Sequence, residues 1–209
     1  MNEIDKKECI QRYNNRLKRF GYKPETLGWA GGKERQYLRF KALMDIQKFL
    51  PYKIKSVLDV GCGFGDMGEF LRNNYSDIKY CGIDINEELI KVGKNKFKKL
   101  DLRVGDILED EIEQFDLVVE SGIFNYQMKG GYKKQLSYIK KMLDRFYELS
   151  NYGFSADFMS SYVDFQSLYN FHLLPEDALN ITKSITDKVI LRYDYLKYEF
   201  CIYGIKNEK

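Results

Sequence analysis

A strand followed by a glycine-rich turn and a helix, VLDVGCGFGD at residues 57–66, constrains this chain more than any other segment. Gly61, Gly63 and Gly65 carry no side chain, so the backbone of such a turn can approach a ligand closely. The spacing is GxGxG, whereas the dinucleotide fingerprint is GxGxxG. Asp59 lies two residues before the first glycine, where a carboxylate suits a ligand with an ammonium group and disfavours a pyrophosphate. The turn therefore predicts a small-molecule site at the end of a strand.

The rest of the chain alternates short apolar runs with helical patterns. Strands are predicted at residues 56–60, 79–84, 102–106, 115–120, 153–159, 188–195 and 198–205. Helices are predicted at residues 5–20, 33–50, 66–73, 86–98 and 133–149, with a loop-and-helix region up to residue 184. Nearly continuous apolar runs are typical of parallel strands buried on both faces, whereas the short interval between the last two strands requires antiparallel pairing. We expect an α/β doubly wound, Rossmann-like sheet that is mostly parallel, with a C-terminal antiparallel hairpin and N-terminal helices.

A length of 209 residues is typical of one domain, which we expect to span residues 1–209. Residues 1–50 are predicted to form a helical arm or lid. Residues 51–209 are predicted to form the core, with a cover insertion near residues 157–184. The turn-rich GYKPETLGWAGG at residues 21–32 resembles a flexible entry loop.

Composition narrows the class of protein. No run of 18 apolar residues is present, and the charged N-terminus lacks the apolar core of a secretory signal. The four cysteines lie far apart without a CxxC pair, and the chain has one histidine. We therefore expect no metal site, no disulfide scaffold and no membrane association, and a cytoplasmic location.

Charge is distributed unevenly along the chain. Residues 1–55 contain 14 Lys and Arg against 6 Asp and Glu, a net charge of +8, although the whole chain carries only +3. A basic arm of this kind can steer an anionic substrate towards a site. The alternative is that these residues are the solvated face of a helix.

Two further carboxylates stand at predicted strand ends. Asp84 ends the second strand, 19 residues beyond Gly65, where a carboxylate can accept both hydroxyls of a ribose. Asp106 ends the third strand and can accept a hydrogen bond from an adenine amino group. Each acid taken alone is equally consistent with a binding role and with an ordinary residue at a strand end or helix cap. Together with Asp59, they place three acids at the carboxyl edge of the sheet, which favours a binding site.

These motifs resemble those of the class I S-adenosylmethionine-dependent methyltransferases. VLDVGCGFGD is similar to their first motif, GIDIN (82–86) to the second, VGDI (104–107) to the adenine-binding segment, and FDLVVESG (115–122) to the strand beside the methionine portion. The resemblance covers residues 55–125 by motif and implies S-adenosyl-L-methionine as cofactor. It implies cofactor-binding roles for Asp59, Gly61, Gly63, Asp84, Ile85, Asp106, Ile107 and Glu120.

The flanking segments are similar to a subgroup associated with bacterial surface-polysaccharide gene clusters. They are LGW (27–29), LRF (38–40) and DYLKYEF (194–200). In that comparison Arg39 is a partner for the carboxylate of the cofactor, which a guanidinium can bind bidentately. The alternative for Arg39 is a solvated helix position. The subgroup is expected to carry a histidine just before the DY pair, and this chain has Tyr193 instead.

Motifs that are absent from the sequence restrict the class of molecule that can accept the methyl group. The Pro-Pro-aromatic pattern of amino methyltransferases for nucleic acids is absent after Glu120, and neither Cys62 nor Cys81 is placed to act as a nucleophile. Nucleic acid is therefore disfavoured. The sequence favours methylation of a small, anionic molecule, most of all at a hydroxyl of a sugar or nucleotide-linked sugar. The alternatives are another small metabolite or a nucleic acid, a non-catalytic cofactor-binding protein, and a nicotinamide-dependent oxidoreductase.

A hydroxyl acceptor needs a group that removes its proton. The candidate bases are His172, Asp194 and Glu120, although a loop histidine, a turn-forming aspartate and a residue lining the cofactor site are equally ordinary interpretations. Trp29 and Tyr126 are predicted to bind the acceptor. Trp29, the one tryptophan of the chain, can alternatively anchor the arm to the core.

Overall fold

The computed structural model describes residues 1–29, 31–75, 77–166 and 169–207. The first half of the chain forms α1 (Glu3–Phe20), the 3-10 helix η1 (Pro24–Leu27), α2 (Gly32–Met44), the 3-10 helix η2 (Asp45–Phe49), β1 (Ser56–Val60), α3 (Asp66–Asn74), β2 (Lys79–Asp84), α4 (Glu87–Lys96) and β3 (Asp101–Val104). The second half forms β4 (Phe115–Ser121), the 3-10 helix η3 (Ile123–Asn125), α5 (Gly131–Leu149), β5 (Ser150–Met159), α6 (Pro175–Lys183), β6 (Lys188–Leu196) and β7 (Glu199–Ile205).

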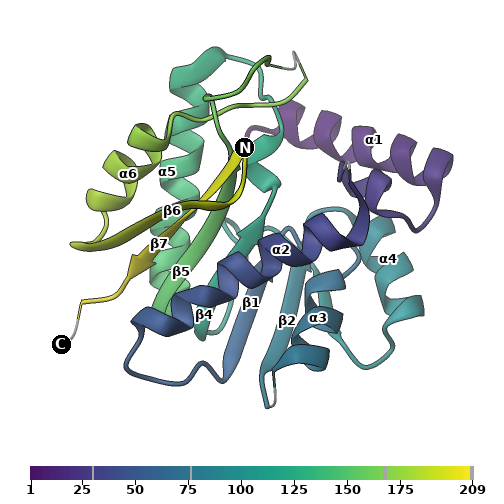
Figure 1. Cartoon of the computed structure of the whole chain (residues 1–209). Helices are drawn as coiled ribbons and strands as arrows, with labels where there is room; N and C mark the ends of the chain where they lie inside the picture. The colour runs from purple at the N-terminus through teal and green to yellow at the C-terminus, as the bar shows by residue number, and fades with distance from the viewer. Residues whose placement is uncertain (30, 76, 167–168, 208–209) are drawn as a thin grey trace.

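The strands form one seven-stranded sheet in the order β3-β2-β1-β4-β5-β7-β6 (Figure 1). The first five strands are parallel, and β7 runs antiparallel to both β5 and β6. The prediction of a doubly wound sheet with a C-terminal antiparallel hairpin is therefore confirmed. The direction of winding reverses between β1 and β4, and ligands of such sheets bind outside the carboxyl ends of the strands at this point.

Helices cover both faces of the sheet (Figure 1). On one face α2 and α3 pack over a core that includes Leu43, Phe70 and Val119. On the other face α5 and α6 pack over a second core that includes Phe146 and Ala178. Because the central strands are buried on both sides, their apolar runs are continuous. This continuity explains why the positions of these strands could be predicted from the sequence.

Two predicted elements end earlier than expected. The helix predicted at 33–50 changes at Met44 into η2, and the side-chain carbonyl of Gln47 accepts the backbone N–H of Ile54 as the chain turns towards β1. The third strand stops at Val104, because the carboxylate of Asp106 accepts the backbone N–H of Leu108 and begins a turn.

The segment expected to form a cover is narrower than predicted. Between residues 157 and 184, β5 continues to Met159, and α6 packs against β6 and β7 as part of the core. Between them, the backbone N–H of Phe171 donates to the carbonyl of Asn125, so this stretch crosses η3 beside the carboxyl edge of the sheet.

Helix α1 lies apart from the sheet, at its carboxyl edge and beside α4 (Figure 1). It is tied down by polar contacts: the carboxylate of Asp5 accepts from Lys134 at 2.7 Å, and Asn86 donates to Asn14 at 3.0 Å. Within the residues described above, no helix combines the length and apolar character needed to cross a membrane.

Candidate functional site

The glycine-rich turn after β1 adopts a conformation that side chains other than glycine resist. Gly61 and Gly63 have φ angles of +72° and +57°. A Cβ atom at Gly61 would lie 2.0 Å from a methyl carbon of Ile123, and one at Gly63 would lie 2.9 Å from a methyl carbon of Leu27. The turn therefore leaves its backbone open only because these two positions are glycine.

Asp84 is held by the backbone on both carboxylate oxygens. Its Oδ2 accepts the N–H of Gly63 at 2.9 Å, and its Oδ1 accepts the N–H of Asn86 at 2.8 Å. Burial raises the pKa of Asp84, and these two N–H groups partly offset that effect. Because each carboxylate oxygen has two lone pairs, one on each remains for a ligand hydroxyl. The arrangement fits the ribose of the predicted cofactor.

Asp106 is contacted by the N-terminal helix. Its carboxylate lies 2.9 Å from the Nζ atom of Lys6, which also reaches Glu109 at 3.3 Å. The hydrogen bond with Asp106 raises the pKa of Lys6. Helix α1 is thus bound to the edge of the site where the adenine is predicted to lie.

A cleft opens at the carboxyl ends of β1, β2 and β4, with α1 along one side. Most of the predicted site residues line it: Trp29, Asp59, Gly61, Gly63, Asp84, Ile85, Asp106, Ile107 and Tyr126. Sequence reasoning missed other lining residues, which include Lys6, Cys9, Ile10 and Tyr13 of α1, Gln36 of α2, and Tyr138 and Met142 of α5.

Asp59 is the most deeply buried acid of the cleft wall. It is 3% exposed and accepts a hydrogen bond of 2.7 Å from the hydroxyl of Tyr80. Burial raises the pKa of Asp59 to about 7, against the opposing effect of that hydrogen bond. Asp59 therefore gains or loses its proton near neutral pH, and it lies where its carboxylate can meet a cationic group of a ligand.

Trp29 closes the cleft at the end of β4. Its ring lies 4.2 Å from the guanidinium carbon of Arg39, and a Cβ atom at Gly122 would lie 2.6 Å from it. The outer edge of the indole therefore packs against the backbone after β4, and the residue also lines the cleft. The two interpretations of Trp29, acceptor contact and anchor of the arm, are compatible in this position.

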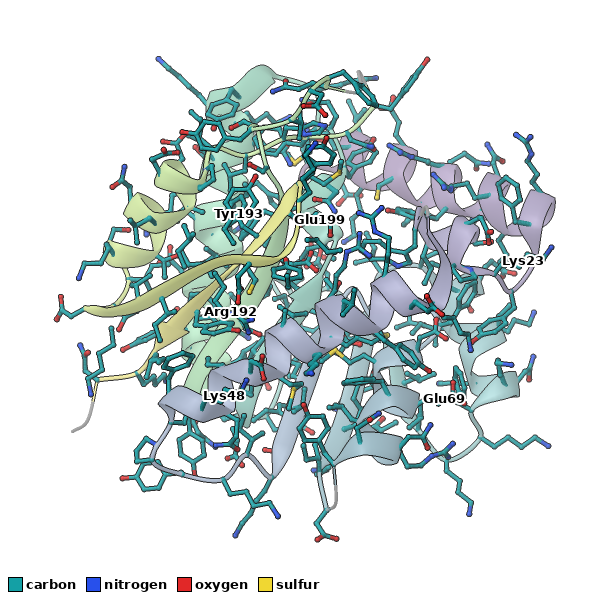
Figure 2. All side chains as sticks on the ribbon, in the orientation of Figure 1. Lys23, Lys48, Glu69, Arg192, Tyr193 and Glu199 are labelled. Atoms are coloured by element: carbon teal, nitrogen blue, oxygen red, sulfur yellow. The ribbon has the colours of Figure 1, made fainter. Side chains whose placement is uncertain are left out.

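Arg39 makes a buried bidentate ion pair with Glu199, the first residue of β7, which is labelled in Figure 2. The Nη1 atom of Arg39 is buried and has no hydrogen-bond partner among the described residues. The guanidinium does not line the cleft directly. A contact with the carboxylate of the cofactor through Nη1 stays a prediction.

Glu120 lies beneath the cleft. Its side chain is fully buried, and its Oε2 accepts the N–H of Ile123 at 3.1 Å. Burial raises the pKa of Glu120 well above its usual range, and the nearby carboxylate of Asp157 adds to the effect. Asp157 was not among the predicted site residues. The signal for it in the sequence was one acid within the predicted strand GFSADFM, whose other side chains are uncharged.

The other two candidate bases lie outside the lining of the cleft. The Nδ1 atom of His172 is 2.8 Å from the carbonyl of Ser160, and its Nε2 is buried without a partner among the described residues. Asp194 is on β6, with a side chain that is 64% exposed and paired with Arg192 at 2.8 Å. Tyr193, where the subgroup is expected to carry histidine, packs against the ring of Phe200 (Figure 2).

Comparison with known proteins gives the same assignment as the motifs. Residues 58–152 match a family described as a methyltransferase domain. The chain is 29% identical over 153 residues to a Mycobacterium tuberculosis protein named "Putative methyltransferase Rv1506c", covering 70% of this chain and 90% of that protein. It is 33% identical over 79 residues to a ubiquinone biosynthesis O-methyltransferase of Coxiella burnetii, of which it covers 33%.

Solved structures share the fold. The magnesium protoporphyrin IX methyltransferase of Synechocystis, solved with S-adenosylmethionine, matches with a TM-score of 0.67 and 13% identity over 97% of each chain. An amino pentose methyltransferase from Micromonospora echinaspora matches with a TM-score of 0.62 and 13% identity, over 83% of this chain and 92% of that one. Together with the glycine turn and the acids at the strand ends, the methyltransferase domain matched by residues 58–152 supports an S-adenosylmethionine-dependent methyltransferase.

Proposed function

We propose that this methyltransferase transfers its methyl group to a hydroxyl of a sugar or nucleotide-linked sugar during the synthesis of a bacterial surface polysaccharide. The observation that carries the proposal is the pair of aromatic rings in the lining of the cleft, with a guanidinium beside one of them. Trp29 and Tyr126 present rings there, and the guanidinium of Arg12 lies 5.8 Å from the centre of the Tyr126 ring. Aromatic rings pack well against sugar rings, and a guanidinium binds phosphate.

The charge of the N-terminal region supports an anionic acceptor. Arg12 donates to the carbonyl of Tyr169 and to the side chain of Asn170, so it lies where α1 meets the segment that crosses η3. Helix α1 itself carries six Lys and Arg against three Asp and Glu, so it adds positive charge at this edge. The amino pentose methyltransferase among the structural relatives acts on a sugar, which is consistent with this choice.

The residues present fit the cofactor. Asp84 has free lone pairs for ribose hydroxyls, the glycine turn has no side chains in the way, and Asp59 can face the ammonium group. We assign the adenine to Asp106, Ile85 and Ile107. When bound, the cofactor supplies an electrophilic methyl group on a sulfonium. The protein contributes by holding the acceptor oxygen in line and by accepting its proton.

We propose a cytoplasmic location because of the oxidation state of the cysteines. All four, Cys9, Cys62, Cys81 and Cys201, are free thiols, as a reducing compartment requires.

The test is an acceptor screen with the purified chain and S-adenosylmethionine. Nucleotide-linked sugars, sugar phosphates and their neutral parent sugars are incubated separately, and products are identified by the mass of one added methyl group. We expect turnover of a phosphorylated or nucleotide-linked sugar, and much slower turnover at low S-adenosylmethionine concentration with Asp84→Ala as the control for the cofactor site. Turnover confined to a molecule without a sugar hydroxyl would contradict the proposal.

A further inference from the structure

Ser121 connects the cleft to a buried carboxylate. It is the last residue of β4, it lines the cleft, and it lies in register with Asp157 on the neighbouring strand β5. The hydroxyl of Ser121 donates to Oδ2 of Asp157 at 2.8 Å. Asp157 is only 2% exposed and does not itself line the cleft. A proton can therefore pass from the cleft to Asp157 through one hydroxyl.

Titratable groups face Asp157 from four other elements. Arg39 of α2 is the cation nearest to its charge, but both Nε and Nη2 of Arg39 are already bound to Glu199 of β7. Glu120 of β4 and Tyr195 of β6 also interact electrostatically with Asp157. Burial and the charge of Glu199 outweigh Arg39, and the pKa of Asp157 is raised to about 7.

The same cluster holds buried polar atoms that lack a partner among the described residues. They are Oε1 of Glu120, Nη1 of Arg39 and the hydroxyl of Tyr195. Buried polar atoms are hydrogen-bonded in most native proteins, and exceptions concentrate where function requires them. Three such atoms around Asp157 indicate that this cluster has a functional role in addition to its packing in the core.

We propose that Ser121 and Asp157 form the proton-accepting relay of methyl transfer, with Ser121 touching the acceptor hydroxyl and Asp157 taking the proton. This inference rests on the proposed function, because only a hydroxyl acceptor must lose a proton from oxygen. Arg39 and Glu199 are positioning residues that set the electrostatic environment of Asp157. The relay does not require His172 or Asp194.

The step balances without a further reactant. The acceptor oxygen gains a bond to the methyl carbon as the carbon–sulfur bond breaks, and the electron pair of that bond stays on sulfur. The acceptor proton passes to Oγ of Ser121, whose own proton passes to Oδ2 of Asp157. Asp157 then returns the proton to water by the same route in reverse once the products leave. A base whose pKa lies near the working pH suits this role.

Kinetics provide the first test, with the acceptor found in the screen. Asp157→Asn should lower kcat by about 100-fold or more, the usual effect of losing a general base. It should also remove the inflection of kcat near pH 7 and leave the affinity for S-adenosylhomocysteine unchanged.

Ser121→Thr should retain most of the activity that Ser121→Ala loses. Asp144→Asn on the exposed face of α5 is the matched control. A wild-type pH profile in Asp157→Asn would overturn the relay and leave the proposed function standing.

The second test uses the protein without any ligand. A folded-state pKa of about 7, against about 4 in the unfolded chain, means that the folded state binds more protons between these values. The free energy of unfolding attributable to Asp157 therefore falls as pH rises from about 4 to about 7, and Asp157→Asn should remove this fall. If no hydroxyl acceptor is found, the proposed function fails. An unchanged dependence of stability on pH in Asp157→Asn would then overturn the assignment of Asp157 independently.

Discussion

Arg39 and Glu199 form a buried bidentate ion pair between α2 and the start of β7, across 160 positions of the sequence. The side chain of Arg39 is 4% exposed and that of Glu199 is 11% exposed. The pair therefore joins the arm to the last strand along the chain, directly beside the ring of Trp29. Removing Glu199 leaves the buried guanidinium of Arg39 without its hydrogen-bonded partner, which costs far more than the pair itself contributes.

Glu199→Ala should accordingly lower the free energy of unfolding by about 3–5 kcal/mol. Urea denaturation followed by circular dichroism measures this. The exposed pair of Lys140 and Asp144 on α5 is the matched control, because Asp144→Ala should cost less than about 1 kcal/mol. Equal losses of unfolding free energy in Glu199→Ala and Asp144→Ala would show that the buried pair matters no more to stability than the exposed one.

Asp84→Ala should weaken binding of S-adenosylhomocysteine by about 1.5–3 kcal/mol, the usual contribution of hydrogen bonds to a charged group. Isothermal titration calorimetry measures the affinity. Since Asp84 also accepts the N–H of Gly63, thermal melting of the free protein must accompany the titration. Asp101→Ala, on an exposed part of β3, should leave the affinity unchanged. Unaltered affinity in Asp84→Ala would remove Asp84 from the ribose site.

Cofactor affinity should depend on pH through Asp59. An ammonium group favours the ionised carboxylate, whereas the free protein holds Asp59 protonated below its pKa of about 7. Binding at lower pH must therefore expel a proton, so affinity should rise with pH up to about 7 and then level off. Calorimetry in buffers of different ionisation enthalpy would count the released proton. Asp59→Asn should bind more weakly and with no such release; an identical pH profile in that variant would exclude Asp59 as the cause.

Turnover of an anionic acceptor should fall as salt is added, because exposed charges are screened beyond about 8 Å at physiological ionic strength. Reversal of the exposed Lys7 and Lys18 on α1 to glutamate should raise KM for the acceptor and leave cofactor affinity unchanged. Arg16 is less suitable for this test, because it holds η1 through the carbonyl of Glu25. Lys140→Glu on α5 is the control. Salt-independent kinetics would assign these lysines to a merely solvated helix face.

The positions of the strands and the acids at the strand ends were accessible from the sequence for a physical reason. Strands buried on both faces must be apolar, so β1 and β2 match their predicted bounds, and Asp59 and Asp84 stand out within them. Contacts between distant segments carry no local pattern. The pairing of Lys6 with Asp106, and the cluster around Asp157, therefore became visible only in the structure.

Helix α1 contacts the cleft through Lys6 at Asp106, and through Arg12 it reaches Asn170, which pairs with the cleft residue Tyr126. A single rigid helix that touches both places cannot move away from one without disturbing the other. We therefore expect the demethylated cofactor and the methylated product to depart through one opening event, so that cofactor exchange shares that kinetic step. A substitution that loosens α1 should shorten the dwell time of both products together, even where it leaves the chemistry at the acceptor oxygen untouched.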